Sequence, residues 1–329
     1  MVERDIIDRG LGVAFEDIAA LQGAKKVLNE AVVLPLIMPE MFTGIRQPWR
    51  GVLLFGPPGT GKTMLAKAVA GVNGSTFFNV SAPTLLSKYR GESEKILRCL
   101  FSLARRRAPS VVFLDEVDAL ASSRGADGEH EASHRLKTQL FIEMDGVLSG
   151  QTSAASADRP GDGPTPGDGD GTFNAGAQVL VLAATNRPEQ LDEAMRRRLE
   201  KRVYVPLPGL PARTELFRLF LRDLLVCEDL EAMALARATE GFSGADIRVV
   251  CREASMMPLR RLLGEKTPEE IQRLRASGQL APGSSGPCSD QTLQVAMSDL
   301  LEAVAATRPS VSAADVQRYV AFDREFGTR

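Results

Sequence analysis

The chain has 329 residues, of which 44% are hydrophobic and 25% are charged, and its formal net charge is −2 at pH 7. This is the composition of an ordinary globular protein, long enough for two domains or for one α/β domain with an appendage. The near-neutral charge and the lack of an apolar run of roughly 20 residues predict no nucleic-acid partner and no membrane partner. Four cysteines without a C-x-x-C pair and two histidines indicate reduced thiols and no structural zinc site.

A glycine-rich turn, GPPGTGKT over residues 56–63, connects an apolar strand at Val52–Phe55 to a helical stretch at Met64–Ala70. In this order the three elements form a phosphate-binding loop, whose backbone N–H groups and helix N-terminus bind phosphate. We expect Lys62 to reach the β- and γ-phosphates and Thr63 to bind Mg²⁺. A chance Gly/Pro turn is the alternative, but it explains neither flank. The loop predicts nucleoside triphosphate binding by Gly56, Pro57, Pro58, Gly59, Thr60, Gly61, Lys62, Thr63 and Met64.

Strand and helix signals alternate through the first half of the chain. Further strands are expected at Thr76–Val80, Val111–Asp115, Val179–Thr185 and Arg202–Val205. The alternation predicts an α/β fold with a parallel five-stranded sheet flanked by helices.

The strand signals stop after the proline-rich turn Pro206–Pro211. We therefore predict an α/β domain over residues 1–206 and a small all-helical domain, including the closing helix, over residues 207–329. Low-complexity residues 149–177 and 277–290 are expected to form a disordered loop and a flexible linker. The helices expected in the second domain are Ala212–Leu225, Leu230–Thr239, Ala245–Leu263, Pro268–Ala276 and Thr292–Ala305.

Polar residues end two of the buried strands, at the sheet edge that a phosphate-binding loop also occupies. Asp115 is expected to hold Mg²⁺ opposite Thr63, and Glu116 to act as the general base toward water. An acidic helix cap is the alternative for this pair. Asn186 follows the next strand and is expected to orient the attacking water, although an isolated Asn is more often a turn residue.

Two further patterns concern surfaces rather than phosphate. The basic run Arg196–Arg202 could be a solvated face, a nucleic-acid contact, or a set of arginines presented in trans to a neighbouring subunit's nucleotide. The last of these requires a closed ring, because the contact is head-to-tail. Tyr319, Phe322 and Phe326 recur at helical spacing and predict an apolar face that is core or subunit interface.

These motifs and their separations resemble the AAA ATPase family. The shared motifs are GPPGTGKT at 56–63, FLDE at 113–116, AATN at 183–186, RRR at 196–198 and GFSGAD at 241–246. Within this family the flanking blocks resemble the microtubule-severing group and, most closely, the katanin catalytic subunit. Those blocks are FEDI at 15–18, EAVVLP at 30–35, SKYRGESEK at 87–95, EHEAS at 129–133, RRRLEKR at 196–202 and SVSAAD at 310–315.

The resemblance implies roles for residues that the spacing alone does not assign. Arg197 and Arg198 are implied as the trans arginines of a homo-hexamer. Asp17 and Ile18 are implied to flank the adenine of ATP, with Gly244 and Ala245 of the helical lid on its other side. ATP and Mg²⁺ are the implied cofactors.

A central pore that grips substrate is also implied by the resemblance. An aromatic between two cations, Lys88-Tyr89-Arg90, is unusual for a surface turn, although Tyr89 could instead pack against its own domain. Six copies of this loop would form a positive ring suited to an acidic chain. The second pore loop is implied to contain His130, His134 and Arg135, with His134 standing where arginine is usual.

The implied substrate is the glutamate-rich C-terminal tail of tubulin, and the implied activity is microtubule severing. The resemblance also implies a regulatory katanin partner, and a cytoplasmic, cytoskeletal location at a spindle pole, centrosome or basal body. Katanin-type proteins carry a microtubule-binding domain ahead of this cassette, so the chain is expected to be a fragment or a short relative. The alternatives are an ESCRT-disassembly ATPase and a non-enzymatic, nucleotide-dependent scaffold.

Overall fold

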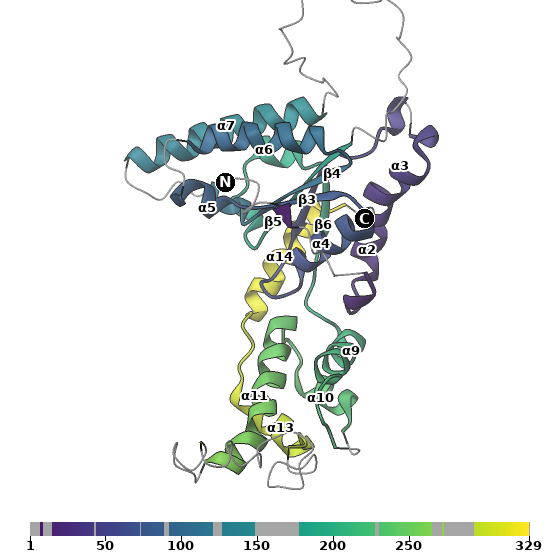
Figure 1. Ribbon diagram of the computed structural model, residues 1–329, viewed down its shortest axis with the longest axis vertical. Helices are drawn as coiled ribbons and strands as arrows, with labels where there is room; N and C mark the ends of the chain where they lie inside the picture. The colour runs from purple at the N-terminus through teal and green to yellow at the C-terminus, as the bar shows by residue number, and fades with distance from the viewer. Residues whose placement is uncertain are drawn as a thin grey trace, which may run out of the picture. The chain divides into compact units, whose positions relative to one another are not determined.

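The computed structural model describes residues 7–8, 15–42, 44–72, 74–88, 92–120, 127–148, 178–227, 230–264, 272 and 293–328 (Figure 1). The predicted loop at 149–177 and the predicted linker at 277–290 lie outside these residues. The chain divides into two compact units. The first comprises Met1–Gly56, Gly61–Val205 and Gln317–Arg329, and the second comprises Pro57–Thr60 and Pro206–Val316.

The first unit is built on a sheet with the strand order β1-β3-β4-β5-β2-β6. Strands β2 to β6 are parallel to one another, so the predicted parallel five-stranded sheet flanked by helices is confirmed. One strand was not predicted: β1 has only two residues and pairs antiparallel with β3 at the sheet edge. The bounds are β1 Ile7–Asp8, β2 Gly51–Phe55, β3 Thr76–Ser81, β4 Ser110–Asp115, β5 Val179–Thr185 and β6 Lys201–Tyr204.

The central strands are apolar because both faces of the sheet are covered. Every residue of β2 and of β5 is buried, as expected for parallel strands between helical layers. Alternate residues of β2 belong to different clusters: Leu53 and Phe55 pack with the helices of one face, and Val52 and Leu54 with those of the other. This arrangement holds the carboxyl ends of the strands in fixed register.

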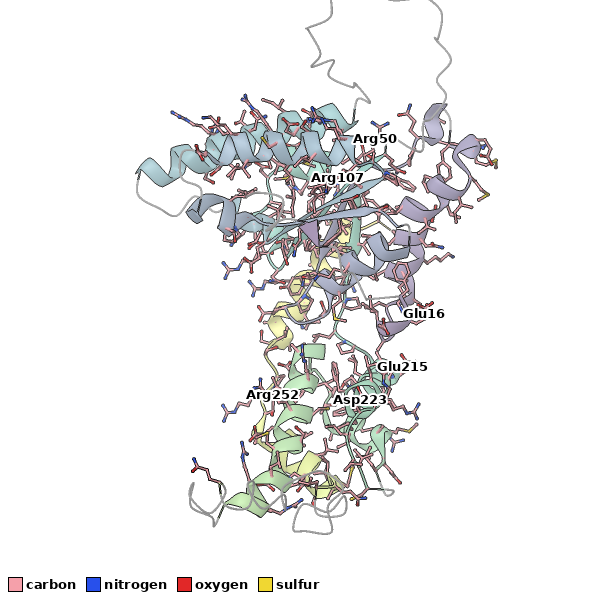
Figure 2. All side chains as sticks on the ribbon, in the orientation of Figure 1. Glu16, Arg50, Arg107, Glu215, Asp223 and Arg252 are labelled. Carbon is pink, nitrogen blue, oxygen red and sulfur yellow. The ribbon has the colours of Figure 1, made fainter. Side chains whose placement is uncertain are left out.

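Two groups of helices cover these faces (Figure 1). Cluster members on one face include residues of α5, α6, α7, α8 and α14, and those on the other include residues of α2, η2 and α4. Arg50, labelled in Figure 2, directly precedes β2 and donates to the carbonyl of Val147 near the end of α7. The helices of this unit are η1 Phe15–Asp17, α2 Gln22–Leu28, η2 Asn29–Val33, α3 Leu34–Ile37, η3 Pro39–Met41, η4 Gly44–Arg46, α4 Lys62–Val72, α5 Ala82–Lys88, α6 Ser93–Arg106, η5 Val117–Leu120, α7 Asp127–Leu148, η7 Pro188–Gln190 and α8 Glu193–Arg198.

The second unit is helical around its own core, which includes Phe217, Leu235, Ile247 and Leu300. Its helices are α9 Leu210–Leu221, α10 Ala232–Ala238, α11 Gly244–Leu263 and α13 Met297–Ala306. The helix expected over Pro268–Ala276 lies, apart from residue 272, outside the described residues. No helix in the described parts of either unit is long and apolar enough to cross a membrane.

The closing helix corrects one prediction. The sequence pattern grouped α14, Ala313–Phe326, with the helical domain, but residues from Gln317 onward belong to the first unit. The reason is aromatic packing: the ring of Phe322 lies 5.0 Å from that of Phe55 in β2, and Tyr319 stacks at 6.5 Å on Tyr204 in β6. The apolar face of α14 therefore belongs to the core of the first unit.

Candidate nucleotide site

The phosphate-binding loop begins where β2 ends. Gly56 has a φ of 148°, and a Cβ placed there would lie 2.2 Å from the carbonyl oxygen of Val205, so a larger residue cannot follow β2 without moving the chain directly after β6. Gly61 adopts a φ of 90° directly before α4. Glycines in these conformations let successive N–H groups turn toward an anion at the helix N-terminus.

Lys62 is buried at the start of α4, with only 7% of its surface exposed. Its ammonium group donates to the carbonyl oxygen of Gly56 at 2.9 Å. Burial lowers the pKa of Lys62 to about 8, and the nearby carboxylates of Asp115 and Asp118 partly oppose this shift. A bound phosphate would add negative charge beside the desolvated ammonium group and so stabilise its charged form.

Thr63 and Asp115 were both predicted to hold Mg²⁺, and the structure brings them together. The hydroxyl of Thr63 donates to the carboxylate of Asp115 at 3.0 Å, joining the first turn of α4 to the last residue of β4. Within the described residues, no group of three or more His, Cys, Asp or Glu side chains could hold a metal ion. A hydroxyl and a single carboxylate fit Mg²⁺, which takes its remaining ligands from phosphate and water.

Glu116, the predicted general base, is exposed directly after β4. Its backbone has a φ of 54°, and its N–H group donates to the carboxylate of Asp115 at 3.0 Å. A left-handed conformation costs a non-glycine residue roughly 1–2 kcal/mol. The left-handed backbone of Glu116 ends the extended conformation of β4, so the side chains of Asp115 and Glu116 do not alternate between the two faces of the sheet as successive strand residues do.

Asn186, the predicted water-orienting residue, lies in the turn after β5. Thr185 shapes this turn, since its hydroxyl donates to Asp118 at 2.7 Å and accepts from the N–H group of Arg187 at 2.9 Å. The side-chain oxygen of Asn186 is buried and has no hydrogen-bond partner in the described parts of the chain. A buried acceptor without a partner is costly, and a bound water could satisfy it.

The residues implied to flank adenine fall in both units. Asp17 is the last residue of η1, next to Glu16, which is labelled in Figure 2, and Ile18 directly follows the helix. Ile18 is buried, and its carbonyl oxygen accepts a hydrogen bond from the ammonium group of Lys25 at 2.6 Å. In the second unit, Gly244 and Ala245 begin α11, and the N–H group of Ala245 donates to the carbonyl of Gly59 at 3.1 Å.

The two arginines implied to act in trans differ in their surroundings. Arg197 is exposed and pairs along its own helix with Glu193, at 2.6 Å. Arg198 is half-buried: its guanidinium forms two hydrogen bonds with Asp145 of α7, at 2.7 and 2.6 Å, and lies 4.3 Å from the ring of Phe141. The hydrogen bonds with Asp145 raise the pKa of Arg198. Of the pair, Arg197 is better placed to reach a neighbouring copy of the chain.

Comparison with known proteins identifies this arrangement. Residues 52–207 match the profile of the "ATPase family associated with various cellular activities (AAA)". Residues 229–273 match that of the "AAA+ lid domain", and residues 290–327 match the "Vps4 C terminal oligomerisation domain". A crystal structure of the FIGL-1 AAA domain aligns with a TM-score of 0.79 at 38% identity, covering 99% of this chain and 94% of that one. The chain belongs to the AAA ATPase family.

Among AAA ATPases, this chain is similar to katanin p60 proteins. It is 48% identical over 327 residues to the A-like 1 form of the katanin p60 ATPase-containing subunit of Danio rerio, covering 99% of this chain and 61% of that protein. It is 48% identical over 328 residues to the A1 form of Arabidopsis thaliana, covering 100% and 57%. A structure titled "Structural Basis for Katanin Self-Assembly" aligns with a TM-score of 0.71 at 36% identity, covering 94% of this chain and 90% of that one. The chain spans about three fifths of the length of these curated relatives.

The residues of this AAA ATPase that were implied to line a pore are only partly described. Lys88 ends α5, whereas Tyr89 and Arg90 lie outside the described residues. His130, His134 and Arg135 all belong to α7, and the side chains of His134 and Arg135 are exposed. The pore role of these residues stays a prediction.

Three residues of the site were missed by reasoning from sequence. Asp118 orients Thr185, Lys25 holds Ile18, and the hydroxyl of Tyr319 donates to the carbonyl of Asn186 at 2.6 Å. Asp118 follows the predicted metal ligand by three positions, which is a signal that could have been used. Tyr319 was recognised only as part of an apolar stripe, because no sequence pattern predicts the hydrogen-bond partner of its hydroxyl.

We expect ATP affinity to fall as the pH rises from 7 to 9.5. The pKa of Lys62 in the free protein is about 8, so at higher pH the side chain is mostly neutral, whereas phosphate binding requires its charged form. The affinity should drop by up to about tenfold per pH unit well above 8, with one proton taken up on binding. Calorimetry in buffers of different ionisation enthalpy measures both quantities. A Lys62→Arg variant stays protonated, so its affinity should show no such slope.

The same pKa shift affects stability in the opposite direction. Between about 8 and the ordinary value of 10.5, the unfolded chain binds more protons at Lys62 than the folded chain does. The free energy of unfolding contributed by Lys62 should therefore rise with pH in this window. Flat ATP affinity from pH 7 to 9.5 would contradict the assignment of Lys62 as a depressed, phosphate-binding amine.

The two arginines should also differ in their effect on stability. Arg197→Ala removes an exposed pair and should change the free energy of unfolding by no more than about 0.5 kcal/mol. Arg198→Ala removes a two-bonded carboxylate pair and a ring contact, and should cost about 1–2 kcal/mol after allowance for solvent screening. Urea unfolding measures both variants. Equal losses would show that the Asp145 contact does not hold Arg198 in solution.

Proposed function

We propose that the chain is the ATP-hydrolysing motor of a microtubule-severing protein. The observation that carries the proposal is its likeness to katanin p60 proteins over 99–100% of its length. The Thr63–Asp115 contact and the unpartnered side-chain oxygen of Asn186 support it. The site residues Lys62, Asp115, Glu116 and Asn186 follow or flank three adjacent parallel strands, β4, β5 and β2. A scaffold that only bound nucleotide would not require Glu116 or Arg197.

The chemistry follows from the roles of these residues. A water oxygen bonds to the γ-phosphorus of ATP while the bond to the bridging oxygen breaks, and the carboxylate of Glu116 accepts the water's proton. The amide of Asn186 orients the water, and its unpartnered oxygen is the acceptor. Lys62 counters phosphate charge. When bound, Mg²⁺ neutralises phosphate oxygens, and Thr63 and Asp115 would hold it.

We place Arg197 of each copy of the chain at the nucleotide of its neighbour. Its exposure supports this role, because a side chain that reaches a neighbouring copy must extend from its own fold. The match of residues 290–327 to an oligomerisation domain, and the likeness to a self-assembling katanin, support a ring. A head-to-tail contact that closes is cyclic, and six subunits are proposed. Arg198 acts as the second trans arginine only if the Asp145 contact opens.

The proposed substrate is the acidic C-terminal tail of tubulin. Lys88, Tyr89 and Arg90 would grip the tail in the central pore, and His130, His134 and Arg135 would form a second ring. The likeness to katanin p60 subunits supports a microtubule substrate and a cytoskeletal location. A regulatory katanin partner is part of the same proposal. Spindle poles, centrosomes and basal bodies are the proposed sites.

A second candidate is disassembly of an ESCRT-type polymer at membranes. The match to the Vps4 C-terminal oligomerisation domain is the observation that favours it. The two candidates are separated by what stimulates the ATPase. Microtubules should do so under the first, and helical ESCRT polymers under the second.

Imaging of fluorescent, stabilised microtubules tests the severing activity. Added with ATP, the chain should introduce internal breaks in microtubules that carry their tails, and none in microtubules whose tails were removed by protease. A Lys62→Ala variant is the control for nucleotide dependence. Intact filaments at saturating protein, together with measurable ATP turnover, would contradict severing while leaving hydrolysis standing.

A further inference from the structure

The turn that carries Asn186 is held by a contact from a distant part of the chain. Its local hydrogen bonds come from Thr185, which joins Asp118 and Arg187. A further bond is made by Tyr319 of α14, 133 positions away, whose hydroxyl donates to the carbonyl oxygen of Asn186 at 2.6 Å. The closing helix α14 therefore fixes the backbone of Asn186, the residue whose buried side-chain oxygen has no hydrogen-bond partner in the described residues.

Tyr319 is suited to act as a fixed donor. Its side chain is buried, with 8% exposed, and its ring stacks on that of Tyr204 in β6. Burial raises the pKa of Tyr319 above its ordinary value, so the hydroxyl keeps its proton at neutral pH. A phenol held by packing loses little further freedom when it donates this bond.

The same helix also contacts β2, α8 and β6 of the first unit. Phe322 packs edge-on against Phe55, the last residue before the phosphate-binding loop, at 5.0 Å. Phe326 lies 4.6 Å from the guanidinium of Arg196, and its carbonyl accepts from Arg202 at 3.0 Å. The docking of α14 is therefore specified over several turns, and the position of Tyr319 follows from it.

We propose that Tyr319 is a positioning residue for Asn186, and that docking of α14 sets the orientation of the water-orienting amide. The proposal rests on the proposed hydrolytic function, because that function gives Asn186 its role in orienting the attacking water. Loss of the hydroxyl frees the carbonyl of Asn186 to move, and the amide on the same residue then spends less time aimed at the water. Nucleotide binding through Lys62 and Thr63 should be unaffected, because these side chains are held by Gly56 and Asp115.

Tyr319→Phe removes only the hydroxyl and tests the idea. We expect kcat for ATP to fall about three- to tenfold, with the affinity for a fluorescent ADP analogue unchanged. Tyr204→Phe makes the same chemical change on the stacked neighbouring ring, and its kcat should equal that of the parent chain. In an Asn186→Ala background, which keeps the backbone carbonyl but lacks the amide, Tyr319→Phe should have no further effect on kcat.

A readout without turnover separates this proposal from the hydrolytic one. Hydrogen exchange of a peptide covering residues 184–188 should be faster in Tyr319→Phe than in Tyr204→Phe. Equal exchange in the two variants, or an equal fold-loss of kcat with and without Asn186, would overturn the positioning role. A parent chain with no turnover at any concentration would instead overturn the hydrolytic function, and the exchange comparison would still decide whether Tyr319 fixes the turn.

Discussion

Replacing Glu116 by glutamine is expected to lower kcat for ATP hydrolysis by about 10²–10⁴-fold while nucleotide affinity stays close to that of the parent chain. The amide has the size of the carboxylate but cannot accept the water's proton. Glu116 is exposed, so the fold should tolerate the change. Steady-state turnover and binding of a fluorescent ATP analogue measure the two effects separately.

The matched control for this variant is Glu302→Gln, which alters an exposed acid on α13 in the second unit. Its kcat should equal that of the parent chain. If Glu116→Gln hydrolysed ATP within a factor of about three of the parent, Glu116 would not be the base. If its nucleotide affinity collapsed as well, the substitution would have disturbed the site rather than the proton transfer.

The second large effect is rescue between two inactive variants. Arg197→Ala should lower kcat about 10³-fold or more, since the neighbouring site loses its charge stabilisation. Glu116→Gln is inactive for a different reason, in its own site. If Arg197 acts in trans, a site with intact Glu116 regains activity whenever the neighbour that supplies the arginine is a Glu116→Gln chain.

The size of the rescue can be estimated from random mixing. In an equimolar mixture, about a quarter of the head-to-tail contacts pair an intact base with an intact arginine, so about a quarter of parental turnover is expected. A mixture of Glu116→Gln with Lys62→Ala is the control, because every site then carries a defect of its own and none should recover. Turnover equal to the sum of the separate variants would place Arg197 in cis or outside catalysis.

Sequence patterns predicted the parts of the fold that depend on neighbouring residues. The strand Val179–Thr185 was expected with the bounds that the structure has, because a fully apolar run between turn signals is typical of a strand covered on both faces. β6 was expected at Arg202–Val205 and is found one residue earlier, at Lys201–Tyr204. The two-residue β1 was missed, since so short an edge strand has no periodicity to detect.

What the sequence could not predict are contacts between distant segments. The apolar stripe on α14 was recognised, but it did not reveal that its aromatic partners lie in β2 and β6 rather than in the helical unit. Asp145 and Arg198 are 53 positions apart, and no spacing rule connects them. The difference between Arg197 and Arg198 is therefore visible only in three dimensions, although both occur in one basic run.

The measurement that tests the central claim most directly is ATP turnover per chain as a function of protein concentration, with microtubules absent, with tails intact, or with tails removed. A ring with trans arginines should show turnover per chain that rises steeply with concentration, and only microtubules that keep their acidic tails should stimulate it further. Turnover per chain that is independent of concentration and unaffected by tailed microtubules would contradict both the shared active site and the tubulin-tail substrate.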